Sequence, residues 1–289
     1  MKNNILFAMR FFVQSILLLF ISFAIFSCSG KKRDAETYLT EARKAYEESN
    51  YALAKLKIDS IKLLFPKSFD EIKAGFALMQ EVRMAENKRN IAFCDSMLRE
   101  SYNQLNEMLT KFDYVRDSRY QEFGEYYPKI YPYQSSLNRN GLRSGVGEKG
   151  ELFIESILSG STIKHNKIKV IANDGSFAET LAVTSDGLNY RFQTLNKSYE
   201  IVRYTGRNEN GVAQFIYIHQ NEPLRVEFIG NRTISVALSD AAKQGIAHSF
   251  ELSTLLLNIE QLKFEKEKSE TLIRYLESKA NKPEDNTAR

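Results

Sequence analysis

The side chains that could do chemistry in this chain are few, since it contains only three histidines and two cysteines. His219 and His248 each have a glutamate three residues on, Glu222 and Glu251, while His165 stands apart. A histidine and a carboxylate at that spacing could share a metal ion, but a zinc site needs three or four ligands. No second His or Cys joins either pair. The sequence therefore predicts no metal site, and it places the histidines at the surface or at strand edges.

The other common catalytic patterns are also missing from the sequence. No Gly-x-Ser-x-Gly elbow occurs, and no Cys/His dyad can be named. A phosphate loop needs Gly-Lys-Ser/Thr opening a helix behind a strand. Here Lys149 precedes Gly150, and the strand-like segment "ELFIESIL" follows. We therefore interpret the glycine run of residues 141–150 as a linker, and we expect neither a cofactor nor an enzymatic activity.

One aromatic cluster is a candidate binding surface. Tyr126, Tyr127, Tyr131 and Tyr133 lie close together in a segment that also holds two prolines. Such side chains could dock a glycan or an extended peptide. The alternative is a linker that packs its aromatic side chains onto the neighbouring domain, because large exposed apolar patches are uncommon.

The remaining candidate for chemistry is Cys28, which ends an apolar run. Residues 1–10 carry Lys2 and Arg10 and no acid, and residues 11–26 read "FFVQSILLLFISFAIF". A membrane-spanning helix needs about 20 residues, whereas the apolar core of a secretory signal needs about 7–15. The run of 16 residues lies between the two, so length alone leaves an uncleaved transmembrane anchor open.

The end of that run, Ile25-Phe26-Ser27-Cys28-Ser29-Gly30, resembles the lipobox of bacterial lipoproteins. Ser27 fits the small position and Cys28 the acceptor, while Phe26 and Ile25 depart from the commoner small residue and leucine. The resemblance implies a signal peptide of residues 1–27 that is cleaved before Cys28. It also implies a diacylglycerol thioether on Cys28, an acylated amine, and hence a membrane as partner. Two or more acyl chains anchor a protein stably.

The residues after Cys28 refine the expected location. Lys31-Lys32-Arg33 lacks the acidic patch that resembles a surface-export signal in some Gram-negative lineages. We therefore expect an outer-membrane lipoprotein facing the periplasm, with a surface-exposed or inner-membrane protein as alternatives. The formal charge of +4 includes the two cations of the leader, so no nucleic-acid footprint is indicated.

Helical patterns dominate residues 28–125. Residues 35–68 resemble one tetratricopeptide repeat, with Ala42 and Ala54 at the small positions and Pro66 closing the unit. A long helix over about 69–120 follows, in which Cys94 lies on an apolar seam of alternating three- and four-residue spacing. Residues 239–280 show a similar seam, and the tail 281–289 is polar. Two long helices with matching seams predict an antiparallel, coiled-coil-like stalk.

Between the two long helices, residues 148–238 alternate apolar and polar side chains. The segments "LNYRFQ", "PLRVEF" and "RTISVAL" are examples, and turn signals such as Asp186-Gly187 separate them. This pattern predicts an antiparallel β-sandwich or small barrel, with residues 126–147 as the linker before it. The expected class is thus α+β, with a helical hairpin, a stalk and a β-domain.

The expected function is that of a membrane-anchored, non-enzymatic protein-interaction or scaffold module with a protein partner in the envelope. The alternative is a ligand-binding lipoprotein whose β-domain holds a glycan or a lipid. A filled β-domain interior with an apolar outer patch favours the first, and an open apolar pocket favours the second.

Overall fold

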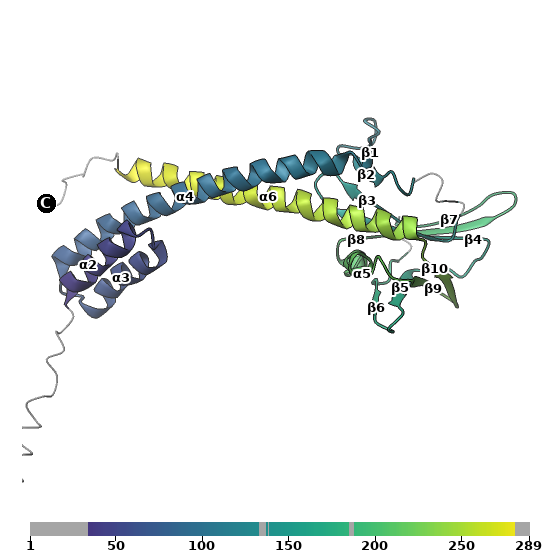
Figure 1. Cartoon of the computed structure of the whole chain (residues 1–289), viewed down its shortest axis with the longest axis horizontal. Helices are drawn as coiled ribbons and strands as arrows, with labels where there is room; N and C mark the ends of the chain where they lie inside the picture. Colours follow the sequence, from purple (N-terminus) through teal and green to yellow (C-terminus); the bar gives the residue numbers. More distant parts are fainter. Residues whose placement is uncertain (1–33, 133–136, 138, 185–187, 281–289) are drawn as a thin grey trace, which may run out of the picture. The chain divides into compact units, whose positions relative to one another are not determined.

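The computed structural model describes residues 34–132, 137, 139–184 and 188–280. At 50% helix and 24% strand, with two antiparallel sheets and long helices, the chain has the mixed helix-and-sheet class that the sequence predicts. It divides into two compact units, Met1–Glu86 and Asn87–Arg289, and helix α4 (Phe69–Leu109) contains the boundary (Figure 1). The predicted signal peptide, Cys28, Tyr133 and the tail 281–289 lie outside the described residues.

Two short helices open the first unit, α2 (Ala35–Glu47) and α3 (Tyr51–Leu64). Both begin at a capping side chain, as expected where the first backbone N–H groups of a helix lack partners. Asp34 accepts from the Thr37 amide at 2.8 Å, and Asn50 accepts from the Leu53 amide at 3.2 Å. These caps fix where each helix starts.

The first unit has its own small core, to which α2, α3 and the first turns of α4 contribute. Alanines dominate its α2 side, and small side chains let helix backbones approach closely. The buried members are Ala42, Ala45, Tyr51, Ala54, Ile58, Leu78, Met79 and Val82.

The larger sheet of the second unit, sheet A, has six antiparallel strands in the order β1-β2-β3-β4-β8-β7. The first four follow the chain as a meander, and β8 and β7 extend the sheet beyond β4. Their bounds are β1 Phe112–Val115, β2 Glu125–Pro128, β3 Gly141–Gly147, β4 Leu152–Ser159, β7 Asn189–Gln193 and β8 Ser198–Thr205.

The strands of sheet A show that two boundaries predicted from the sequence are wrong, namely the end of the long helix and the extent of the linker. The long helix ends at Leu109 and not near residue 120, because Phe112 enters strand β1 and pairs with Pro128 of β2. Residues 126–147 are not simply a linker, since they hold part of β2 and all of β3. Gly145 shows why a glycine-rich segment forms a strand here. A Cβ at that position would lie 2.4 Å from the Phe153 ring, so only glycine admits this ring.

The smaller sheet, sheet B, has the order β10-β9-β5-β6 and is also antiparallel. Its strands are β5 Lys167–Ala172, β6 Phe177–Glu179, β9 Leu224–Ile229 and β10 Thr233–Ala237. A one-turn helix at Gly206–Asn208 and helix α5 (Val212–Ile218) interrupt the segment that the sequence predicts as purely β. Gly211 precedes α5 with φ +81°, a conformation that favours glycine.

Both sheets, α5 and the start of helix α6 (Asp240–Ala280) share the main core (Figure 1). Sheet A contributes residues such as Ile154 and Val202, and sheet B contributes Val226 and Phe228. All four are fully buried. Further along α6, Leu252 joins Phe112 and Val146 in a second cluster. The interior of the β-domain is therefore filled by side chains.

Candidate functional site

Three polar side chains that are far apart in sequence meet in the interior of the β-domain. The Ser156 hydroxyl oxygen lies 2.7 Å from Nε2 of His165, and Nδ1 of His165 lies 2.8 Å from Oε2 of Glu200. Strand β4 carries Ser156, β8 carries Glu200, and the loop between β4 and β5 carries His165. Their order of contact is that of a serine–histidine–acid triad.

The partners settle the protonation of the histidine. The Glu200 carboxylate can only accept, so Nδ1 carries the proton, and Nε2 accepts from the Ser156 hydroxyl. Burial lowers the pKa of His165, against the opposing effect of Glu200. Burial raises the pKa of Glu200, but the hydrogen bonds from His165 and Lys164 outweigh it, so the pKa lies below its ordinary value. At neutral pH the pair is thus a neutral imidazole beside a carboxylate.

Burial decides what this arrangement can do. Ser156 and His165 are both 0% exposed, and Glu200 is almost as deeply buried. A serine nucleophile must reach a carbonyl carbon of its substrate, with oxyanion donors about 3 Å from the reacting oxygen. No such approach reaches a side chain without solvent exposure. The geometry therefore supports a structural role for these three residues, which we call the Ser–His–Glu network.

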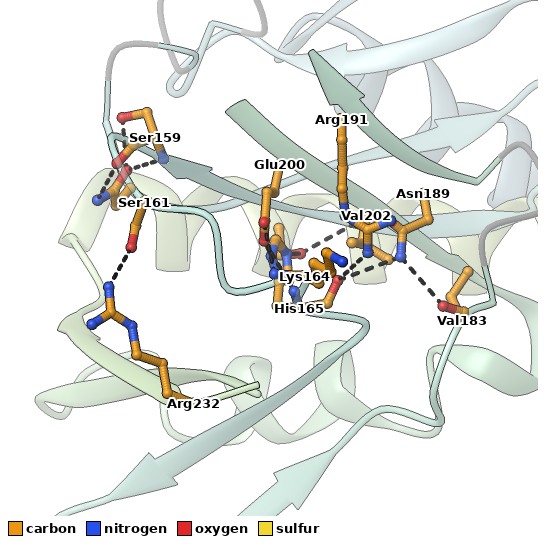
Figure 2. Close-up of polar contacts among 12 residues, drawn as sticks. Ser159, Ser161, Lys164, His165, Val183, Asn189, Arg191, Glu200, Val202 and Arg232 are labelled. Atoms are coloured by element: carbon orange, nitrogen blue, oxygen red, sulfur yellow. Dashed lines mark hydrogen bonds and ion pairs between the residues drawn. The ribbon is translucent and has the colours of Figure 1, made fainter. Parts of the chain in front are cut away.

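That role is visible in the loop of residues 160–166, which links the two sheets. Besides His165 Nδ1, the Glu200 carboxylate accepts from the backbone amides of Lys164 at 2.7 Å and His165 at 2.9 Å (Figure 2). Lys164 has φ +57°, which is uncommon for a residue with a side chain. The carboxylate thus holds an unfavourable loop conformation in place from the side of sheet A.

Sheet B holds the same loop from its other side. The Asn231 amide donates to the Ile163 carbonyl at 2.7 Å, and the Asn166 amide donates to the Ile229 carbonyl at 3.1 Å. A Cβ on Gly230 would lie 2.3 Å from the Ile163 carbonyl oxygen, so this backbone approach requires glycine. The loop is therefore clamped between the two sheets.

A second buried polar network crosses the opposite face of sheet A. Glu155 accepts from Arg143 at 2.6 Å and from Arg203 at 2.7 Å, and Arg203 also reaches Glu125 at 2.7 Å. The Arg203 guanidinium lies over the Phe153 ring, 3.9 Å from its centroid. Burial opposes the charge of Arg203, but Glu155 and Glu125 outweigh it and raise its pKa. The carboxylates therefore compensate the partial burial of this guanidinium, which is always charged in a protein.

The structure does not bring the three described tyrosines of the predicted cluster together on one surface. Tyr126 and Tyr127 are adjacent on β2, so they point to opposite faces of sheet A. Tyr126 packs beside Tyr114, with ring centroids 5.0 Å apart, and Tyr127 packs edge-on against Phe153 at 6.0 Å. Tyr131 is half-buried against the main core. The ligand-binding role of these side chains stays a prediction.

The other two histidines occupy different environments. His219 at the end of α5 is half-buried, with Nδ1 3.4 Å from Glu222. Burial lowers the pKa of His248, and the charge of Lys111 adds to this. The predicted surface or strand-edge position is wrong for His165, which is fully buried. Across the described ranges, no three His, Cys, Asp or Glu side chains gather in a way that could hold a metal ion.

A groove opens on the outside of the second unit, where the end of α4, α5 and α6 meet. It has a volume of about 490 Å³. Tyr217 and Phe250 pack together in it, with ring planes tilted by 38° and ring centroids 5.1 Å apart. Its apolar floor and polar rim are formed by Gln104, Glu107, Met108, Lys111, Tyr217, Phe250, Glu251, Thr254, Leu255 and Asn258. We call this the helix groove.

Comparison of the chain with protein-family models, with curated proteins and with solved structures finds no match. Among the helices that the structure describes, none is sufficiently long and apolar to cross a membrane.

Sequence reasoning missed the Ser–His–Glu network, although a local signal for two of its members exists. Ser156 lies between Ile154 and Leu158 at a spacing of two, and therefore on the same buried face of β4. Glu200 lies in the same way two residues before Val202 on β8. The sequence signal for these two members of the network was therefore a polar residue on the apolar face of a strand. The pairing of Leu158 with Glu200 brings the two strands into register.

Proposed function

We propose that the chain is an envelope lipoprotein, anchored through Cys28, that acts as a non-enzymatic protein-interaction module. In this proposal the mature protein faces the periplasm from the outer membrane. The lipobox-like residues around Cys28 support the anchor, and the deep burial of Ser156 and His165 supports a role without catalysis.

The observation that carries the interaction role is the contrast between the filled β-domain and the open helix groove. Side chains such as Tyr204 and Phe228 fill the interior between the sheets and are fully buried. The helix groove instead lies outside, with apolar side chains such as Met108 and Leu255 in its floor. An amphipathic helix of a partner binds such grooves through its apolar face. The charged rim residues Glu107 and Lys111 would then set the register of that helix.

A second candidate function is the binding of a small apolar ligand in the same groove. Its volume of about 490 Å³ falls in the range of ligand pockets, roughly 300–1,000 Å³. In this alternative the ligand lies between helices and not inside the β-domain.

Capture from envelope extract distinguishes the two functions. The chain from residue 28 onward is expected to retain a protein partner, and Thr254→Arg is expected to reduce that recovery about tenfold or more. Thr254 is exposed on the groove rim, so the long cation obstructs the groove without disturbing a core. Quantitative mass spectrometry of the eluates gives the measurement.

Thr271→Arg is the matched control, because it makes the same chemical change at an exposed position of α6 outside the groove. Its recovery of the partner should equal that of the unmodified chain. Equal loss in both variants would remove the groove from the proposal. Release of a small molecule with no protein would favour the ligand-binding function.

We further propose that α4 and α6 run antiparallel and form a stalk, and that sheets A and B form a two-sheet sandwich. Three contacts within the second unit support the antiparallel order. Asn90 donates to Ser269 at 2.8 Å, Lys266 contacts Asp95 at 2.6 Å, and Lys263 lies over the Tyr102 ring. Residue numbers rise along one helix as they fall along the other.

The pair Asn90→Cys and Ser269→Cys, introduced together with Cys94→Ala, should form a disulfide rapidly under mild oxidation, as seen on non-reducing gels. The control pair Asn90→Cys and Thr254→Cys should stay reduced. Failure of the first pair to cross-link would contradict the stalk.

A further inference from the structure

Helix α3 carries a second apolar face that the core of the first unit does not use. Its buried residues Tyr51, Ala54, Ile58 and Ile61 share one side of the helix. At 3.6 residues per turn, Leu53, Leu56, Leu63 and Leu64 fall together on the other side. All four leucines are exposed, with Leu56 at 62% and Leu63 at 79%. We call these four residues the leucine stripe.

The position of the stripe in the chain limits what can cover it. The first described helix begins at Ala35, seven residues after Cys28. An extended chain spans at most about 3.6 Å per residue, so an acylated Cys28 would hold α2 within about 25 Å of the bilayer. The anchor would therefore keep the first unit, which begins at α2, close to lipid.

Helix α3 itself is cationic, although most of its lysines lie beside the core face and not on the stripe, and residues 34–86 together hold ten acids against eight Lys and Arg. Helix α3 contains Lys55, Lys57 and Lys62 against the single acid Asp59, and Lys67 follows its end. Lys55 and Lys57 pair with Glu86 and Glu41, whereas Lys62 and Lys67 are exposed. Three more cations, residues 31–33, lie between Cys28 and the helices. Cations near a membrane surface are attracted by anionic headgroups.

We propose that the leucine stripe is a membrane-docking face, which rests on an anionic phospholipid surface beside the anchor. An interfacial helix buries an apolar face at the headgroup boundary and keeps its cations at the headgroups. This inference rests on the proposed lipid anchor at Cys28. It adds that the first unit itself contacts lipid and so fixes how that unit lies on the bilayer.

The test supplies the tether artificially, so that it does not depend on acylation in the cell. The chain from residue 28 onward contains every residue that the structure describes, and Cys94→Ala leaves Cys28 as its only thiol. Cys28 is coupled to a maleimide-headgroup lipid in vesicles of phosphatidylethanolamine and phosphatidylglycerol that also contain a photoactivatable phospholipid. Mass spectrometry then locates the lipid adducts formed on illumination.

Adducts are expected to concentrate in residues 51–64 and to fall at least about fivefold in the double variant Leu56→Glu/Leu63→Glu. Both leucines are exposed, so these changes spare the core. Leu195→Glu is the matched control, because Leu195 is fully exposed in the second unit, and its adduct pattern should equal that of the parent. Replacing phosphatidylglycerol with phosphatidylcholine should also lower the yield.

Adducts that are absent from α3, or that the double variant leaves unchanged, would overturn the docking face. A dimer of the untethered chain that the double variant dissolves, without adducts on α3, would assign the stripe to self-association instead. Adducts on α3 in a protein that carries no lipid in cells would retain the face and reject the proposed anchor.

Discussion

Glu200→Gln is expected to lower the free energy of unfolding of the β-domain by about 3 kcal/mol, although the new side chain has almost the same shape. Three donors meet the two carboxylate oxygens: the amides of Lys164 and His165, and Nδ1–H of His165. A glutamine places an NH₂ group where one of those oxygens was, so at least one buried donor would face another donor. Urea unfolding followed by a β-domain signal measures the loss.

Hydrogen exchange localises the same effect. The amides of Lys164 and His165 should exchange markedly faster in Glu200→Gln than in the unmodified protein, because they lose their acceptor. Glu267→Gln is the matched control, since Glu267 is exposed on α6, and its unfolding free energy should change by less than about 0.5 kcal/mol. An unchanged midpoint and unchanged exchange in Glu200→Gln would show that the carboxylate does not clamp the loop.

The pH dependence of stability provides an independent readout of this network. The pKa of His165 lies below its ordinary value of 6.5, and that of Glu200 lies below 4.5. The folded protein therefore binds fewer protons than the unfolded chain at acid pH. Both lowered pKa values contribute fully to the free energy of unfolding above pH 6.5. These contributions are lost as the pH falls, first when the histidine is protonated and then when the glutamate is protonated. Glu200→Gln removes the second step.

Cys28→Ala, in the chain with its leader, is expected to abolish lipid attachment and to shift most of the protein out of the washed membrane fraction. Each buried methylene of an acyl chain contributes about 0.8 kcal/mol to membrane binding, so losing two or three chains removes the anchor. Incorporation of a labelled fatty acid, followed by fractionation, gives the measurement. Cys94→Ala is the control, because Cys94 is the other cysteine and is buried.

Two results would contradict the anchor at Cys28. Label that persists in Cys28→Ala would place the lipid elsewhere. An intact mass of the unmodified protein that still includes residues 1–27 would instead indicate an uncleaved transmembrane segment. In that case both the unmodified protein and the variant would stay in the membrane.

How far the sequence predicts this structure depends on how local each signal is. Alternation within single strands and apolar seams within single helices are local, so the mixed class and long helices such as α6 follow from them. The end of α4 cannot be predicted from a local signal, because Phe112 and Val115 fit a helical seam as well as a strand. Strand β1 forms through its pairing with β2, and this leaves Val115 exposed.

The polar interior was harder to predict, since its members meet only through tertiary pairing. Ser156 and Glu200 each stand out on an apolar strand face, but His165 comes from a loop and carries no periodic signal. Its place depends on the register of β4 with β8 and on the close approach of Gly230. The glycines of β3 resembled a linker because the ring that requires one of them, Phe153, comes from the next strand.

The strand order has a consequence for how the domain folds. Strands β1 to β4 pair with their sequence neighbours, so this meander can form through short loop closures. Strand β4 also pairs with β8, which places Ser156 opposite Val202, 46 residues away in sequence. Sheet B likewise requires β5 to pair with β9, which places Ile168 opposite Phe228. Pairings of such high contact order slow folding. We therefore expect the clamped loop between the sheets to be completed late, because during synthesis one edge of β4 and one edge of β5 stay unpaired until β8 and β9 have been made.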